Sequence, residues 1–136
     1  MAGYLNRPAE TAAMIDVDGW VRTGDLGYVS EDGCVSVVDR LKNLIKVNAL
    51  QVAPAELESL LLTHPSIADA VVIAEPDERT GEAPVALVVR RSDDVTAAGL
   101  REWLDPQVAH YKRLRDVRFV ATIPRGPSGK VLRALL

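Results

Sequence analysis

The chain has 136 residues, of which 48% are hydrophobic and 26% charged. This composition is typical of one globular domain, or of a small domain with an appendage. Its longest uncharged apolar stretches, 70–74 and 83–89, are too short to cross a bilayer, and its first residues lack the pattern of a signal peptide. Cys34 is the single cysteine, which excludes an internal disulfide and a cysteine-based zinc site. We therefore expect a cytoplasmic protein with no membrane span.

The net charge of −3 conceals an asymmetry along the chain. Residues 110–136 hold seven Lys or Arg and one Asp, so this segment carries +6 and the first 109 residues carry −9. A basic segment on an acidic body predicts an anionic partner such as a nucleotide, although a solvated basic face is the alternative. Nucleic acid is the less favoured partner, because Tyr111 and Phe119 alone are a poor stacking platform for single strands.

The first half of the chain predicts a hairpin and a helix. From about residue 19 to 40, two short β-rich runs flank the Asp32-Gly33 turn, which is typical of a β-hairpin. Pro54 suits the first position of a helix whose apolar face holds Leu57, Leu60 and Leu61. This helix should end near residues 64–65, where a proline follows His64.

The second half predicts two long strands, a helix and a third strand. The strands cover 67–74 and 83–90 and are joined by a charged turn, 75–82. Thr96 can cap the helix that follows, and Pro106 kinks this helix or begins a new one. A strand over 116–123, a loop over 124–129 and a helical turn from Lys130 complete the chain. We expect an α+β fold, with an N-terminal β-hairpin segment followed by a mostly antiparallel three-stranded sheet packed by helices.

Two common kinds of site are absent from the sequence. Ser128-Gly129-Lys130 resembles the end of a phosphate-binding loop, but Pro124 occupies the position of the first glycine and Val131 follows the lysine in place of Ser or Thr. His64 and His110 have no ligand-spaced partners, so we expect no metal site.

Several polar residues lie where the backbone is conformationally special. Asp25 ends a glycine-containing turn, where a carboxylate can accept hydrogen bonds from two vicinal hydroxyls. Arg40 follows the hairpin, and Lys130 follows a loop rich in proline and glycine, where an ammonium can meet a phosphate. Taken one at a time, a turn former, a surface ion pair and an exposed lysine explain these residues better than a site does.

The joint pattern is far more specific. Four segments in this order resemble the closing motifs of the adenylate-forming acyl-CoA synthetases, the family of 4-coumarate–CoA ligases, fatty acyl-CoA ligases and luciferases. They read Gly-Trp-Val-Arg-Thr-Gly-Asp at 19–25, Val-Asp-Arg-Leu-Lys-Asn-Leu-Ile-Lys at 38–46, Gln-Val-Ala-Pro-Ala-Glu-Leu-Glu at 51–58 and Ile-Pro-Arg-Gly-Pro-Ser-Gly-Lys at 123–130. The resemblance covers essentially the whole chain.

The resemblance implies a ligase that works in two half-reactions. A carboxylic acid attacks ATP, which binds with Mg in the complete enzyme, to give an acyl-adenylate and pyrophosphate. Coenzyme A then displaces AMP. A small C-terminal domain rotates between the steps over a large N-terminal domain, which is its partner. Residues 1–41 would be the end of the large domain, and residues 42–136 would be the mobile domain, called the lid below.

The resemblance also assigns roles to individual residues. Lys130 would be the adenylation lysine, and Lys46 and Gln51 would approach the acyl-adenylate in the other lid orientation. Asp25 would bind the ribose hydroxyls. Arg40 would contact the ribose or phosphate side of the nucleotide, and Val37 would pack near it. Lys42 would be the hinge. The tunnel for coenzyme A would be lined by Asn48, Ala49 and Leu50.

Two departures from the family pattern bear on activity. The family usually has Lys-Gly-aromatic where this chain has Asn48-Ala49-Leu50, and Ala49 lacks the easy access to positive φ that glycine has. Coenzyme A transfer would therefore be slowed. The phosphate loop, adenine pocket and acyl pocket of the family precede the first residue here, so we interpret the chain as a truncation that is inactive alone.

Three other interpretations stay open. The chain could be the corresponding part of a peptide-synthetase adenylation module. It could also be a stand-alone module that docks on a separately encoded large domain or on an acyl-carrier partner, without chemistry of its own. The segment 1–41, which would normally pack on the large domain, could instead form a homodimer. The acyl substrate cannot be read from this part of the enzyme.

Overall fold

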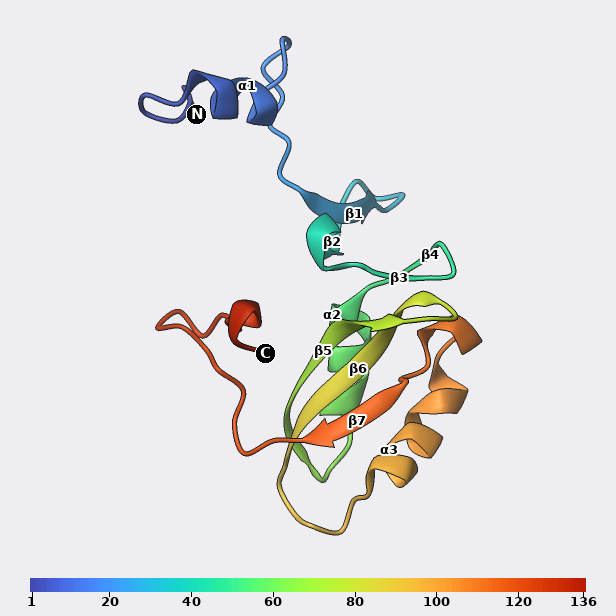
Figure 1. Ribbon diagram of the computed structural model, residues 1–136. Coiled ribbons are helices and arrows are strands. Elements are labelled where there is room, and N and C mark those ends of the chain that lie inside the picture. The colour runs from blue at the N-terminus through green and yellow to red at the C-terminus, as the bar shows by residue number, and fades with distance from the viewer.

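The computed structural model describes all residues from 1 to 136, in three helices and seven strands (Figure 1). In chain order these are α1 (Pro8–Met14), β1 (Asp25–Val29), β2 (Val35–Arg40), β3 (Ile45–Val47), β4 (Leu50–Val52), α2 (Pro54–Leu62), β5 (Ile67–Asp77), β6 (Gly81–Arg90), α3 (Ala97–Leu104) and β7 (Asp116–Phe119). Single 3₁₀ turns occupy Leu41–Asn43, Asp105–Gln107, His110–Lys112 and Arg133–Leu135. The α+β class and the N-terminal hairpin, β1–β2, are confirmed.

The main sheet has five strands, two more than expected. Its order is β4-β3-β6-β5, and β7 also pairs with β6, in parallel, while the other pairs are antiparallel. The two additional strands, β3 and β4, are three residues long each. They form a hairpin with a two-residue turn, in the stretch that we expected to be a connection. Such short strands leave little periodicity in a sequence.

The long hairpin β5–β6 extends further than predicted, because its turn is short. Pairing continues to Asp77 and Gly81, within the stretch expected to be a charged turn. The Asp77 carboxylate accepts hydrogen bonds from the backbone N–H groups of Arg79 and Thr80 and from the Thr80 hydroxyl. These bonds lower the pKa of Asp77 below its ordinary value of 3.8, the Thr80 hydroxyl contributing most.

The helix signals lie close to where the sequence placed them. Pro54 opens α2, which ends at Leu62, and the Thr96 hydroxyl accepts a hydrogen bond from the Gly99 N–H at the start of α3. Pro106 lies in a separate 3₁₀ turn, Asp105–Gln107, and does not kink α3. The last strand is shorter than expected and ends at Phe119, and the C-terminal helical turn begins at Arg133, so Lys130 lies outside the helices and strands.

Successive side chains of a strand point to opposite faces of the sheet, and here both faces are buried. One face carries Ala70, Val72, Ala86 and Val88 and packs against α2 and α3 through their buried leucines. The other face carries Val71 and Leu87 and is covered by the tail, through Ile123 and Val131. The C-terminal tail is therefore part of the core of residues 44–136, and the residue next to Lys130, Val131, packs against the second face of the sheet.

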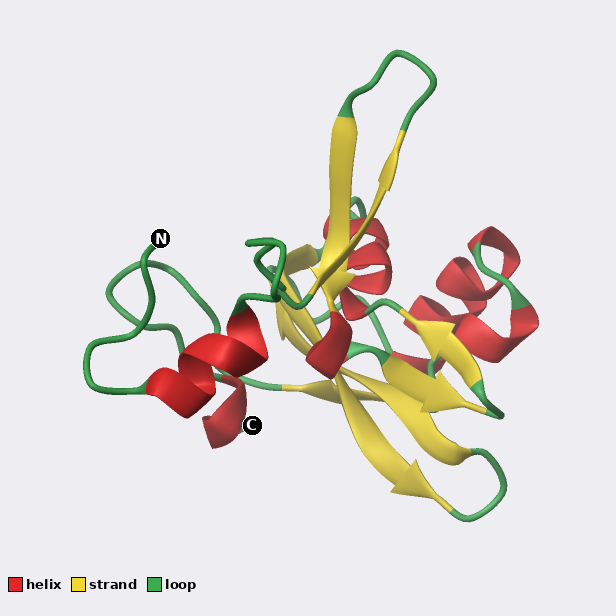
Figure 2. Cartoon of the chain, turned by 90° about the horizontal axis from the view of Figure 1, so that it is seen from above, coloured by secondary structure: helices red, strands yellow, loops and turns green.

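Residues 1–43 lie outside this core. None of them is buried, whereas all of the buried residues lie at or beyond Leu44. In Figure 1 these residues form the upper part of the molecule, and Figure 2 shows the N-terminal helix outside the central strands. No helix is long and apolar enough to span a membrane.

Candidate functional site

Asp25 and Arg40 form an ion pair where the first hairpin begins and ends. They are opposite each other in the β1–β2 register, and the Arg40 Nε lies 2.7 Å from Asp25 Oδ1. The Arg40 Nη1 donates to the Thr23 carbonyl at 3.0 Å, and the Asp25 N–H donates to the Thr23 hydroxyl at 3.2 Å. The second carboxylate oxygen of Asp25 has no partner and is free to accept a ligand hydroxyl.

Arg40 also lines a basic groove with Lys42 and Lys130. The groove has a volume of about 820 Å³ and is otherwise lined by Asn43 and residues 131–135 of the tail. Lys42 and Lys130 are exposed, and neither side chain makes an ion pair or hydrogen bond. Two free ammonium groups beside a guanidinium form a binding surface for a phosphate or carboxylate.

The tail holds Lys130 by contacts on both sides of it. The backbone of Arg125 bridges that of Val131, and the Gly126 N–H donates to the Lys130 carbonyl at 2.8 Å. The Arg133 guanidinium donates to the Val72 carbonyl at 2.7 Å and to Glu58 at 2.8 Å. Sequence reasoning missed the role of Arg133, because its partners on α2 and β5 lie 75 and 61 positions away.

Lys46 and Gln51 come together on the β3–β4 hairpin, away from the basic groove. They are directly opposite in the register, both are exposed, and neither lines the groove. The turn that joins the strands is Asn48-Ala49, at φ +48 and +63. Leu50 follows and is half exposed. Ala49 thus adopts the left-handed conformation that glycine takes more easily, at a cost of roughly 1–2 kcal/mol.

A small pocket of about 240 Å³ adjoins this turn. Asn48 lines it together with His110 and three arginines, Arg79, Arg113 and Arg115. Arg113 and Arg115 have acidic neighbours, at 3.6 Å and 3.5 Å, whereas the Arg79 side chain has no partner. The pocket therefore keeps positive charge next to the turn.

Asp39 connects the N-terminal segment to the lid across Lys42. Its Oδ2 accepts a hydrogen bond from the Ala55 N–H at 3.1 Å, in the first turn of α2, and its Oδ1 accepts one from the Asn43 side chain at 3.1 Å. The helix has no cap from its own N-cap residue, Ala53. Asp39 thus fixes α2 against β2 in the present orientation.

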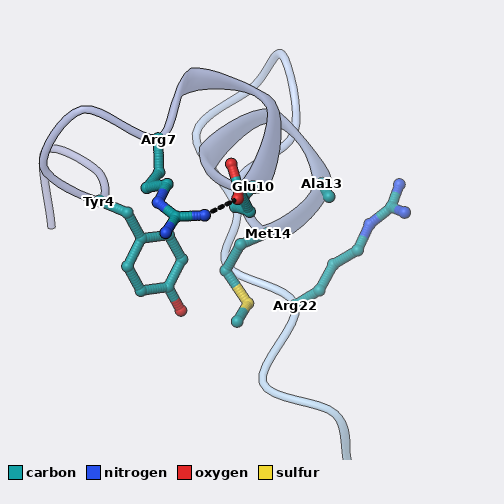
Figure 3. A pocket seen from close by; sticks show the side chains of 6 residues that line it. All are labelled: Tyr4, Arg7, Glu10, Ala13, Met14 and Arg22. Carbon is teal, nitrogen blue, oxygen red and sulfur yellow. Dashed lines mark hydrogen bonds and ion pairs between the residues drawn. The ribbon is translucent and has the colours of Figure 1, made fainter.

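Val37 and the N-terminal helix stand apart from these groups. Val37 lies opposite Gly27 in the middle of the β1–β2 hairpin, is 65% exposed and does not line the basic groove. Figure 3 shows an open hollow beside α1, where Arg7 pairs with Glu10 and the side chains of Tyr4 and Met14 lie in view. This largely apolar hollow is uncovered.

Comparison with known proteins decides the family. Residues 56–130 match the family model described as the AMP-binding enzyme C-terminal domain. The chain belongs to this family. It is 56% identical over 134 residues to 4-coumarate–CoA ligase 2 of Oryza sativa subsp. japonica, covering 98% of this chain and 24% of the rice protein. This AMP-binding C-terminal domain thus spans about a quarter of the length of the curated relatives it matches.

Solved structures support the same assignment. ATP-bound MatB from Rhodopseudomonas palustris matches with a TM-score of 0.91 at 34% identity, over 98% of this chain and 27% of that one. The o-succinylbenzoate–CoA synthetase MenE from Bacillus subtilis, in complex with its acyl-adenylate, gives 0.90 at 36% identity, over 98% of this chain and 27% of that one. Apo MatB gives 0.71 over the same coverage. The domain is the C-terminal domain of an acyl-CoA ligase, close to the plant 4-coumarate–CoA ligases.

Proposed function

We propose that this chain is the lid portion of an ATP-dependent acid–thiol ligase and that Lys130 is its adenylation lysine. The observation that carries the proposal is the basic groove, in which the free ammonium groups of Lys130 and Lys42 lie with Arg40. When a carboxylate attacks the α-phosphate of ATP, negative charge builds up on the reacting oxygens and on the departing pyrophosphate. A preoriented ammonium stabilises this charge most where water is excluded.

Asp25 and Arg40 would hold the nucleotide. The free oxygen of Asp25 can accept hydrogen bonds from ribose hydroxyls, and the ion pair keeps its carboxylate oriented. MatB and MenE were solved with ATP and with an acyl-adenylate, and both match this chain at TM-scores of 0.90 or more. The chain matches ATP-bound MatB at a TM-score of 0.91 and apo MatB at 0.71, and this difference supports a role for the present arrangement in adenylation and for Lys42 as the hinge.

The β3–β4 hairpin would serve the second half-reaction. After the lid rotates, Lys46 and Gln51 would approach the acyl-adenylate and the turn from Asn48 to Leu50 would line the path of coenzyme A. The positive pocket beside Asn48 suits the phosphates of coenzyme A, since Arg79 is unpaired there. The methyl group of Ala49 narrows the same path, so thioester formation would be slow compared with adenylation.

The division between the two parts is proposed at residues 41 and 42. It is supported by burial, which begins at Leu44, and by the exposed apolar side chains of the first segment, Trp20 among them. The N-terminal large domain of the ligase is the partner that would cover them. The carboxylic acid is unassigned, and a cytoplasmic location stays a prediction. Without its partner the chain would release no pyrophosphate.

A chimera tests the proposal. The chain would replace the matching C-terminal quarter of the rice 4-coumarate–CoA ligase 2, with pyrophosphate release measured with 4-coumarate and ATP. We expect release, and a loss of about 10²–10³-fold in Lys130→Ala, the range for removing one charge-stabilising donor. Lys112→Ala is the matched control, because Lys112 pairs with Glu56 and does not line the basic groove. A chimera that folds and binds ATP but releases nothing, or a Lys130→Ala variant as active as its parent, would refute the proposal.

The stand-alone module is the second candidate function. Its supporting observation is the uncovered apolar surface of residues 1–43, which needs a partner. Adding the isolated chain to the separately expressed first three-quarters of the rice enzyme separates the two functions. Binding with restored release supports the lid, and binding without release supports an interaction module. Sedimentation of the chain alone tests the predicted homodimer, which a monomer at high concentration would contradict.

A further inference from the structure

The loop that carries Lys130 is closed on itself but needs a link to the sheet. Residues 126–129 are Gly-Pro-Ser-Gly, and their small side chains are mostly exposed. The Gly129 N–H donates to the Gly126 carbonyl at 2.9 Å, and the Gly126 N–H donates to the Lys130 carbonyl. These bonds fix the shape of the loop. Because both bonds lie within the loop, the orientation of the loop relative to the sheet depends on other contacts.

Arg125 supplies such a link through three separate nitrogens. Its Nη2 and Nε donate to the two carboxylate oxygens of Asp69 on β5, at 2.8 and 3.2 Å. Its Nη1 donates to the Gly129 carbonyl at 2.9 Å. Asp69 is itself held on the strand, because its Oδ1 also accepts the Ala70 N–H at 2.9 Å.

We infer that Asp69 and Arg125 are a positioning pair for Lys130. The Gly129 carbonyl belongs to the same planar peptide unit as the Lys130 nitrogen, so a bond that holds this carbonyl also orients the start of the lysine. The guanidinium can make all three bonds at once because it is planar and presents five N–H donors in a rigid fork. A lysine at position 125 would have a single nitrogen in place of the three that make these bonds.

The electrostatics and exposure of the pair agree with this role. The hydrogen bonds from Arg125 to Asp69 raise the pKa of the guanidinium above its already high ordinary value, so the ion pair is present at every pH at which Asp69 is ionised. The two side chains are 40% and 26% exposed, and ion pairs this exposed add little to folding stability. Loss of the pair should therefore affect the placement of Lys130 more than the folding of the lid. The inference rests on the proposed adenylation role of Lys130.

The test uses the chimera described above and follows its two half-reactions separately. We expect Arg125→Gln to lower the kcat of pyrophosphate release by roughly 10- to 100-fold, because small misplacements of a catalytic group have effects of this size. Transfer to coenzyme A from supplied coumaroyl-adenylate should change less than about twofold, since Lys130 is not expected to act in that step. Asp69→Asn should act in the same direction. Arg118→Gln is the matched control, because Arg118 makes a similar forked pair with Glu75 on the same sheet.

A double variant separates positioning from a general structural effect. If Arg125 acts through Lys130, Arg125→Gln should lower pyrophosphate release no further in a Lys130→Ala background. Equal loss in both half-reactions, or the same fold-loss with and without Lys130, would overturn the inference. So would an Arg125→Gln variant with wild-type adenylation. If Lys130→Ala itself has no effect, the proposed function fails first, and the two failures are thus distinguishable.

Discussion

Replacing Ala49 by glycine should stabilise the chain, because Ala49 lies at φ +63 in the turn between β3 and β4. The left-handed conformation costs an alanine in the folded chain roughly 1–2 kcal/mol, and glycine removes this cost. Glycine also lowers the free energy of unfolding by about 0.4–1 kcal/mol, because it makes the unfolded chain more flexible. The net gain is about 1 kcal/mol in the free energy of unfolding. With an unfolding entropy of about 2.1 cal/mol/K per residue, the melting temperature of this 136-residue chain should rise by about 3–4 °C.

Thermal unfolding followed by circular dichroism measures this change. Ala109→Gly is the matched control, because Ala109 is also exposed but lies at φ −62, where alanine is unstrained. The control should be destabilised by roughly 0.5–1 kcal/mol through the unfolded chain alone. If both variants lose stability equally, then the left-handed turn is not strained and the reasoning from its φ value is wrong.

Two further changes test contacts described above. Asp39→Ala should lower the free energy of unfolding in a urea titration by about 1 kcal/mol, because α2 loses its only side-chain cap. Asp93→Ala is the control and should have little effect, because Asp93 forms an exposed surface ion pair. For Asp77, whose pKa is lowered in the folded chain, the stabilisation is present above the ordinary value of 3.8 and is lost as the pH falls through the folded pKa. Urea midpoints should therefore separate wild type from Asp77→Asn at pH 7 and converge at low pH; a constant separation would contradict the assignment.

Much of the fold could be predicted because single residues dictate local backbone geometry. Thr96 caps α3, Pro54 opens α2, and Asp32-Gly33 turns the first hairpin, each as its chemistry requires. The β3–β4 hairpin escaped prediction because its strands are short and its turn carries Ala49 where a glycine signal is usual. Strand ends were less predictable than strand centres, as the early end of β7 shows.

The candidate site could be predicted in part from the motif resemblance. The resemblance named Arg40, Lys42 and Lys130, and the structure brings these three to one groove. It gave no role to Arg125 and did not include Asp69; these residues are 56 positions apart and meet only because the tail crosses the second face of the sheet. A contact of this kind depends on strand register and tail path, and neither leaves a local signal in the sequence.

The burial of the tail has a consequence for how the lid forms during translation. Val71 and Leu87 stay uncovered until Ile123 and Val131 have been synthesised, and β6 lacks its β7 neighbour until residues 116–119 have been synthesised. Exposed strand edges and apolar faces make partly folded chains prone to aggregation. The core is therefore complete only after the segment that carries Lys130 has been synthesised, so the covering of the second sheet face and the placement of this lysine are one folding event.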